Sequence, residues 1–139
     1  MNKSYEFLNI DSSSLSLDAI KALIAKAKES EEGVYRLNCH DSFEDGLQQM
    51  IICLTNKEGK VHRHKNTDEV ISVLEGRMEV VLYDESLNKT KSILLDREEN
   101  AGILRIKRNT WHKNYPLDDF VVFHEISSGP FKPENMETK

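Results

Sequence analysis

The chain has 139 residues, which is enough for one domain and too few for two ordinary ones. Hydrophobic residues make up 38% and charged residues 31% of the sequence, so we expect one folded domain with an adequate core. The net charge of −5 argues against a nucleic acid or an anionic membrane as partner, because binding to phosphates needs a basic surface.

Two local features could qualify this picture. Arg105, Lys107 and Arg108 form a basic cluster, which we interpret as a solvated strand edge rather than a phosphate site. Cys39 and Cys53 lack CxxC spacing, so we interpret them as small buried hydrophobes on strands rather than as disulfide, redox or metal groups. No apolar run has the length of a signal peptide or a membrane span, and we therefore expect a cytoplasmic protein.

The first predicted element is a helix, within an N-terminal extension over residues 1–33. Ser16 can cap its start, Asp18 favours the positive end of its dipole, and Gly33 lies just beyond its end. We expect its apolar stripe to pack on a sheet rather than to cover a partner subunit. The stripe consists of Leu17, Ile20, Leu23, Ile24 and Ala27.

Residues 34–127 read as consecutive short strands that form the main domain. Turn residues at 56–59, 75–76 and 84–89 separate several of them. No helical segment lies between the strands, so a sandwich or a barrel is predicted rather than a parallel α/β sheet. The predicted strands are 34–40, 47–55, 60–64, 69–75, 77–83, 90–95, 102–107 and 119–126.

The last segment, residues 128–139, is predicted to be a C-terminal tail. Together with Ser127 it is rich in polar residues and contains two of the three prolines. We expect it to be poorly ordered or loosely docked.

The most informative stretch contains His62, His64 and Glu69. Side chains alternate along a strand, so the two histidines point the same way, and a four-residue turn can bring Glu69 back to the same point. Two imidazoles and a carboxylate make an N/O site suited to a first-row transition metal. Gly76, at the next turn, suits a positive φ.

A fourth ligand is predicted to be His112, which follows Gly102, a strand and a polar turn. Three histidines and one glutamate leave one or two positions open on the ion, and an open position distinguishes a reactive site from a structural one. The ligand set suits iron, manganese, nickel, cobalt or zinc and does not select among them. The alternative is that these are ordinary surface or core histidines.

The pattern from His62 to Gly76 resembles the first motif of the cupin superfamily. That motif begins with a Gly and continues with HxH, three or four residues, a Glu, six residues and a second Gly. Gly59 stands closer to the HxH than that preceding glycine does. The resemblance implies a mainly β fold, a single double-stranded β-helix or jelly-roll barrel, here with an N-terminal α-helix.

The second cupin motif runs from a Gly through a Pro-containing turn to a metal-binding His, and Gly102 and His112 match its ends. Arg108 and Thr110 replace the usual Pro and Gly of the turn, and the His comes one residue early. This departure concerns the geometry of the turn and leaves the predicted ligands intact.

The sequence more closely resembles the WbuC family of cupin-fold metalloproteins, over roughly residues 34–131. That resemblance implies a bound metal and a link to sugar or surface-polysaccharide metabolism, without a defined reaction. The C-terminal segment is shorter here than is usual in that family. The matching segments are residues 36–40, Gln48 with Met50, the HxH block, residues 74–76, Trp111-His112, and Glu125 with Gly129-Pro130.

Further polar side chains are candidates for a pocket beside the metal. Arg36, Asn38 and His40 share one phase of a predicted strand, and Gln48 lies on the next strand. Burying such groups without partners costs about 1–3 kcal/mol each, so they either line a pocket or face solvent. His40 is the candidate acid or base, or a group that supports a ligand.

The remaining candidates are Glu125, His124, Tyr83 and Trp111. Glu125 could support a metal ligand or face solvent, and a satisfied core or surface role is the main alternative for His124. The two aromatic residues could form walls of the pocket, although aromatic residues on strands usually only pack.

Three functions fit the sequence. The first is a metal-dependent enzyme acting on a small polar molecule such as a sugar derivative, with the oxygenase, isomerase and hydrolase classes all open. The second is a metal-containing module that binds or senses a small molecule without turnover. The third is a metal-free barrel with a structural role. We expect a homodimer, because barrels of this kind pair through an edge strand or an N-terminal segment.

Overall fold

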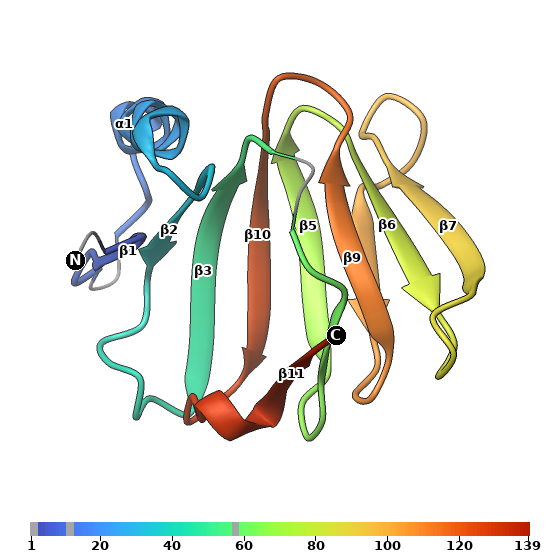
Figure 1. The fold of residues 1–139 in the computed structure, drawn as a ribbon. Coiled ribbons are helices and arrows are strands. Elements are labelled where there is room, and N and C mark those ends of the chain that lie inside the picture. The colour runs from blue at the N-terminus through green and yellow to red at the C-terminus, as the bar shows by residue number, and fades with distance from the viewer. Residues whose placement is uncertain (1–2, 11–12, 57–58) are drawn as a thin grey trace.

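The computed structural model describes residues 3–10, 13–56 and 59–139, which form two β-sheets and one α-helix (Figure 1). The predicted turn at 56–59 lies partly outside these residues. The helix α1 spans Leu17–Glu29, and a short 3-10 turn spans Pro133–Asn135. Among the described residues, no helix has the length and apolar character of a membrane span.

The first sheet has six strands and the second has five. In spatial order, the first sheet consists of β1 (Tyr5–Phe7), β2 (Val34–Asn38), β3 (Leu47–Leu54), β10 (Val121–Ser128), β5 (Glu69–Glu75) and β8 (Ile103–Ile106). The second consists of β11 (Met136–Thr138), β4 (His62–His64), β9 (Trp111–Pro116), β6 (Met78–Tyr83) and β7 (Lys89–Leu95).

All neighbouring strands pair antiparallel except β1 and β2, which pair parallel. The mainly β fold with an N-terminal helix is confirmed, and each predicted strand is present. The two sheets are not joined into one closed barrel. Strands β1, β9 and β11 were not predicted from the sequence. Strands β1 and β11 are only three residues long, and β9 is rich in polar residues.

The main core lies between the two sheets. Ile71, Val73 and Phe123 of the first sheet pack with Met78 and Val80 of the second, and all five side chains are buried. These strands alternate core and outer side chains, as expected when two sheets pack face to face. The face of each sheet that carries these residues is called the inner face below.

A second, smaller core lies between α1 and the outer face of the first sheet. Leu23 and Ala27 of the helix are fully buried against a face that includes Leu37 and Ile51. The predicted packing of the helix on a sheet is therefore confirmed. Leu17 does not join this contact, because it lies in the first turn and remains 80% exposed.

The predicted helix cap is present, and the prediction of buried cysteines on strands is confirmed for Cys53 and not for Cys39. The Ser16 side chain accepts a hydrogen bond of 3.1 Å from the Ala19 N–H, which satisfies one donor of the first turn. Cys53 is buried on β3, Cys39 is half-buried just after β2, and both are free thiols.

Left-handed backbone occurs in the turns that lead into β6, β8 and β9. Gly76 has φ of +83° between β5 and β6, and Gly102 has φ of +69° before β8. In the turn before β9, the left-handed residue is Asn109, with φ of +64°. Asparagine tolerates this conformation, so the turn forms without the proline and glycine of the cupin motif.

The C-terminal tail is ordered by pairing, and the prediction of a loosely docked tail is wrong. Strand β11 pairs antiparallel with β4, with Met136 opposite His64 and Thr138 opposite His62. Asn135 docks on the turn after β4: its Oδ1 accepts from the Asn66 N–H at 2.6 Å, and its Nδ2 donates to Thr67 at 3.0 Å.

Replacing Gly76 with Ala should lower the free energy of unfolding by at least about 1–2 kcal/mol, because a side chain is strained at positive φ. A Cβ would also lie 2.8 Å from the Phe120 carbonyl oxygen. Urea unfolding measures the change. Gly46→Ala is the matched control, since its Cβ would meet nothing within 4 Å. Equal stabilities for the two variants would contradict the strain.

Replacing Asn135 with Ala should lower the free energy of unfolding by about 1–2 kcal/mol, because two side-chain hydrogen bonds to the turn after β4 are lost. Thermal unfolding followed by circular dichroism measures the loss. Glu134→Ala, an exposed neighbour in the same turn, should have little effect. If both variants unfold like the parent, the tail does not stabilise this end of the sheet.

Candidate metal centre

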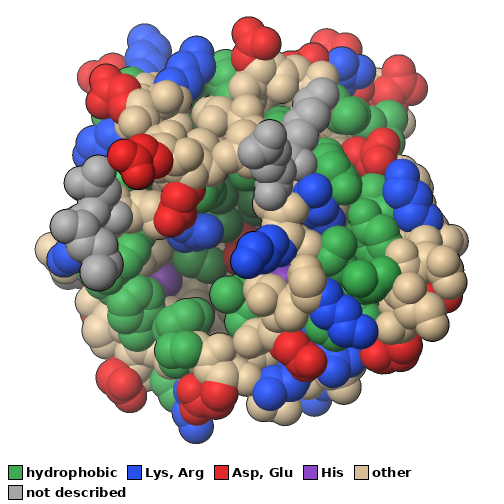
Figure 2. Space-filling model, in the orientation of Figure 1, with side chains coloured by type: hydrophobic (Ala, Val, Ile, Leu, Met, Phe, Trp, Pro, Cys, Tyr) green, Lys and Arg blue, Asp and Glu red, His purple; other side chains and the backbone are tan. Residues whose placement is uncertain are grey.

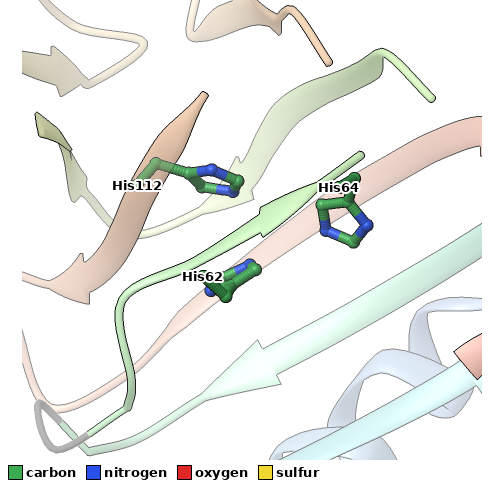
Figure 3. Close-up of side chains that lie close together, drawn as sticks. All are labelled: His62, His64 and His112. Carbon is green, nitrogen blue, oxygen red and sulfur yellow. The ribbon is translucent and has the colours of Figure 1, made fainter. Parts of the chain in front are cut away.

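Three histidines converge between the sheets (Figure 3). His62 and His64 lie two residues apart on β4 and therefore share a face. His112 on β9 is paired directly with His62. One ring nitrogen from each histidine lies within 4.8 Å of the others. Nitrogens bound to one ion at about 2.1 Å are at most about 4.2 Å apart, so a small inward shift would suffice to bind it.

The backbone orients two of these rings. The Nδ1 atom of His62 lies 3.1 Å from the Lys60 carbonyl oxygen, and Nδ1 of His112 lies 2.8 Å from that of Thr110. A carbonyl can only accept, so in each case Nδ1 carries the proton and Nε2 keeps a free lone pair. Metal-binding histidines are commonly oriented in this way.

Burial keeps the three rings neutral. It is the main cause that lowers the pKa of His62, His64 and His112. The charges of neighbouring histidines also lower the pKa values of His62 and His64, and burial and these charges together lower the pKa of His64 to about 4. Neutral imidazoles are the form that binds a metal.

Glu69, at the start of β5, adds a carboxylate from the first sheet. Its Oε1 lies 3.0 Å from Nε2 of His64 and 3.4 Å from Nε2 of His112, and the residue is 2% exposed. Burial raises the pKa of Glu69, whereas a hydrogen bond with the Glu125 carboxyl lowers it. Burial and the charge of Glu69 raise the pKa of Glu125 well above its usual range, so the neutral Glu125 donates in this bond.

These residues fit a metal ion. Nε2 of His112 is buried and has no hydrogen-bond partner among the described residues, and the buried carboxylate of Glu69 keeps lone pairs besides the one that accepts from Glu125. Unpartnered buried polar atoms are costly, and a cation between them would use their lone pairs. The three-histidine group could therefore hold a metal ion, and Glu69 is placed to complete an N/O ligand set.

Asp68 connects the two segments that supply the ligands, and sequence reasoning missed it. Its carboxylate accepts from the Arg105 side chain at 2.7 Å and from the Arg108 backbone N–H at 2.8 Å. The Arg105 guanidinium and the Arg108 donors hold the pKa of Asp68 well below its usual range. Two residues of the basic cluster thus pair with Asp68, and an acidic residue directly before Glu69 was the available signal.

A second link joins the same segments through the backbone. The Asn109 N–H donates to the His64 carbonyl oxygen at 2.7 Å. Together with the Asp68 contacts, it ties the turn after β4 to the turn before β9. These two turns flank His64, Glu69 and His112, so their relative position sets the shape of the site.

Three candidate pocket residues lie on the inner face of the first sheet. Arg36 pairs with the core residue Ile52, and Asn38 pairs with Met50, which also pairs with Glu125. Paired residues point to the same side of a sheet, so Arg36, Asn38 and Glu125 face inward. Asn114 alternates with His112 on β9 and therefore also faces inward. Sequence reasoning missed it because β9 was not predicted.

His40 and Gln48 are held by the backbone near the end of β2. The Gln49 N–H donates to Nδ1 of His40 at 2.9 Å, and the ring packs edge-on against Phe7. The Gln48 amide donates to the Asp45 carbonyl at 2.8 Å and to two further carbonyls of the same loop. Gln48 therefore fixes this loop, and no described contact joins either residue to the three histidines.

Three candidate pocket residues face away from the site. Trp111 precedes His112 on β9, so it points to the outer face, where Arg63 covers its ring at 4.4 Å. Tyr83 pairs with Trp111 and shares that face. His124 alternates with Glu125 on β10 and contacts Gln49 at 2.9 Å on the outer face of the first sheet.

The molecule is hollowed on the side seen in Figure 1. Figure 2 shows a depression in this face with histidine, acidic and basic side chains in its depth. Apolar side chains surround part of the opening. A concave site with a few convergent polar groups is the usual form of a small-molecule pocket.

Several solved structures have a fold similar to that of this chain. Protein SO0799 from Shewanella oneidensis has a TM-score of 0.66 at 15% identity, covering 88% of this chain and 82% of that one. KdgF from a Halomonas species has a TM-score of 0.56 at 16% identity, covering 75% and 84%. The cupin domain of Cnp3 from Schizosaccharomyces pombe has a TM-score of 0.55 at 10% identity, covering 70% and 66%.

At these identities the likeness concerns the fold, which is that of the cupins, as the motif predicted. The WbuC-like subtype stays a prediction. No curated protein matches the sequence. The family model described as "Domain of unknown function (DUF6016)" matches residues 15–95, which is more than half of the chain. The chain therefore belongs to the DUF6016 family and has the cupin fold.

Proposed function

We propose that this protein binds one divalent transition metal through His62, His64, His112 and Glu69, and that it is a metal-dependent enzyme acting on a small polar molecule. The observation that carries the proposal is the convergence of three neutral imidazoles on a buried carboxylate, whose Oε1 lies 3.0 Å from Nε2 of His64. The site lies between the sheets of a fold that is hollowed on one side.

A bound ion of this kind would polarise a substrate oxygen or lower the pKa of a bound water. The chain's own residues would orient and bind. The carbonyls of Lys60 and Thr110 fix two imidazoles in the ligand tautomer, and Glu125 donates a hydrogen bond to Glu69. Four protein ligands leave positions for substrate or water.

A non-catalytic module that binds or senses a small molecule is the second candidate. The observation that favours it is the place of His40, the predicted acid or base. Its Nδ1 is bonded to the backbone, and its ring packs against Phe7 and Phe43. Turnover would then have to use another group, and Glu125 is the inward-facing candidate.

Several further parts of the proposal rest on the sequence, and the last of them rests on the family resemblance alone. They are a cytoplasmic location, a homodimer, a small-molecule ligand, and a place in sugar or surface-polysaccharide metabolism.

Replacing His62, His64 or His112 with Ala should reduce the metal content from about one equivalent to a small fraction, because each change removes one of the converging nitrogens. The protein should be purified without an affinity tag or chelator and its metals measured by mass spectrometry. Circular dichroism should show that each variant remains folded.

His124→Ala is the matched control, since that ring lies on the outer face of the first sheet. It should retain the parental metal content. Full metal content in all three site variants, or equal loss in the control, would overturn the assignment of the ligands.

A further inference from the structure

The inner face of the first sheet carries a guanidinium beside the metal site. Arg36 lies on β2, one alternation from Asn38, and its strand is joined through β3 to β10, which carries Glu125. The Nη1 atom of Arg36 donates to the Ser4 hydroxyl at 2.9 Å. Glu125 pairs with Ile71 on β5, two residues from Glu69, so Arg36, Glu125 and Glu69 share the inner face of this sheet.

Arg36 has no carboxylate partner among the residues that the structure describes. Most other arginines have one: Arg63 pairs with Glu137, Arg77 with Asp118, and Arg105 with Asp68. A half-buried guanidinium that is held only by a hydroxyl keeps several N–H donors free. Their planar arrangement matches a carboxylate, which can accept two of them at once.

Two amides supply hydrogen-bond acceptors on the same inner faces. Asn38 is 1% exposed, and its Oδ1 is buried without a hydrogen-bond partner among the described residues. Oδ1 of Asn114, on the facing sheet, is in the same state. A buried acceptor without a donor is unfavourable, and a ligand hydroxyl group can donate the missing hydrogen bond.

We propose that the hollow binds a small hydroxylated carboxylic acid, with its carboxylate on Arg36 and a hydroxyl group on Asn38. This inference rests on the proposed function, in which another oxygen of the same molecule would reach the ion held by the three histidines. It names the chemical class of the ligand, which the metal site by itself does not.

The spacing of the groups sets the length of the ligand. Two residues along β2 separate Arg36 from Asn38 by about 7 Å, and two strand spacings separate Asn38 from Glu125 by about 10 Å. These spans suit the chain of a six-carbon sugar acid better than that of a two-carbon acid. Neutral polyols of equal length would lack the contact with Arg36.

Titration calorimetry with D-gluconate and D-glucitol tests the proposal, because the two compounds differ only in a carboxylate replacing a hydroxymethyl group. D-glucuronate and D-glucose form a second pair. Each is titrated into the protein with and without added zinc, whose content is measured separately. We expect at least one acid to bind ~10- to 100-fold more tightly than its neutral partner, as a charge-assisted bidentate contact would provide.

Two substitutions separate the roles. Arg36→Gln should remove the preference for the acid while leaving the zinc content unchanged. Asn38→Ala should weaken binding of the hydroxylated acid about tenfold and leave that of hexanoate, which has no hydroxyl group, unaltered. Arg97→Gln, which removes an exposed positive charge elsewhere, is the control and should bind like the parent.

The outcomes distinguish this inference from the proposed function. A parent protein that holds no metal would contradict the proposed function, and the comparison of acid with polyol would still be made on the metal-free protein. No preference for either acid, a preference that survives Arg36→Gln, or tighter binding of glucose 6-phosphate than of both acids would overturn the assignment of a carboxylate.

Discussion

The backbone pairing of His62 with His112 is the interaction on which the candidate centre depends. It is the one register position that joins β4 to β9, and it places histidines from distant parts of the sequence side by side. The three-residue strand β4 could not hold this position alone. Its other edge is paired along its length with β11, so the centre is built from three segments that lie far apart in the chain.

Electrostatic contacts supplement this pairing at the ends of the strands. Asp68 and Asn109 join the turn after β4 to the turn before β9, and Asn135 joins the first of these turns to the C-terminal segment. Such local contacts also set the arrangement of the ligands, because each ligand's orientation depends on its turn. The site then keeps buried lone pairs that are unfavourable without a cation.

Much of the centre could be predicted from the sequence because side chains alternate along a strand. That rule placed His62 and His64 on one face and put Arg36 and Asn38 in one phase. By the same rule, residues next to each other in a strand point to opposite faces. Trp111 therefore cannot share a face with His112, and His124 cannot share one with Glu125. All four were candidates for the site, because β9 was not predicted as a strand and the sequence alone does not show which residues of β10 face inward.

Other features depend on contacts that leave no periodic signal. The docking of the tail follows from hydrogen bonds between residues about 70 positions apart, such as the one between Asn135 and Asn66. The fixing of His40 and Gln48 by backbone groups likewise depends on the path of the loop between β2 and β3. Local composition indicates polar surface in both places and does not indicate the partner.

The position of Trp111 on the outer face of the second sheet determines what its fluorescence can report. Trp111 is the only tryptophan in the sequence. It precedes His112 on β9, so the two side chains point to opposite faces of the sheet. The Arg63 guanidinium and the Lys139 ammonium lie over its ring at 4.4 and 5.0 Å, and its Nε1 donates to Glu85 at 3.2 Å. Its fluorescence therefore arises from one indole whose surroundings include the end of β11. An unlabelled sample thus contains a spectroscopic reporter of whether the C-terminal strand is seated behind the histidines.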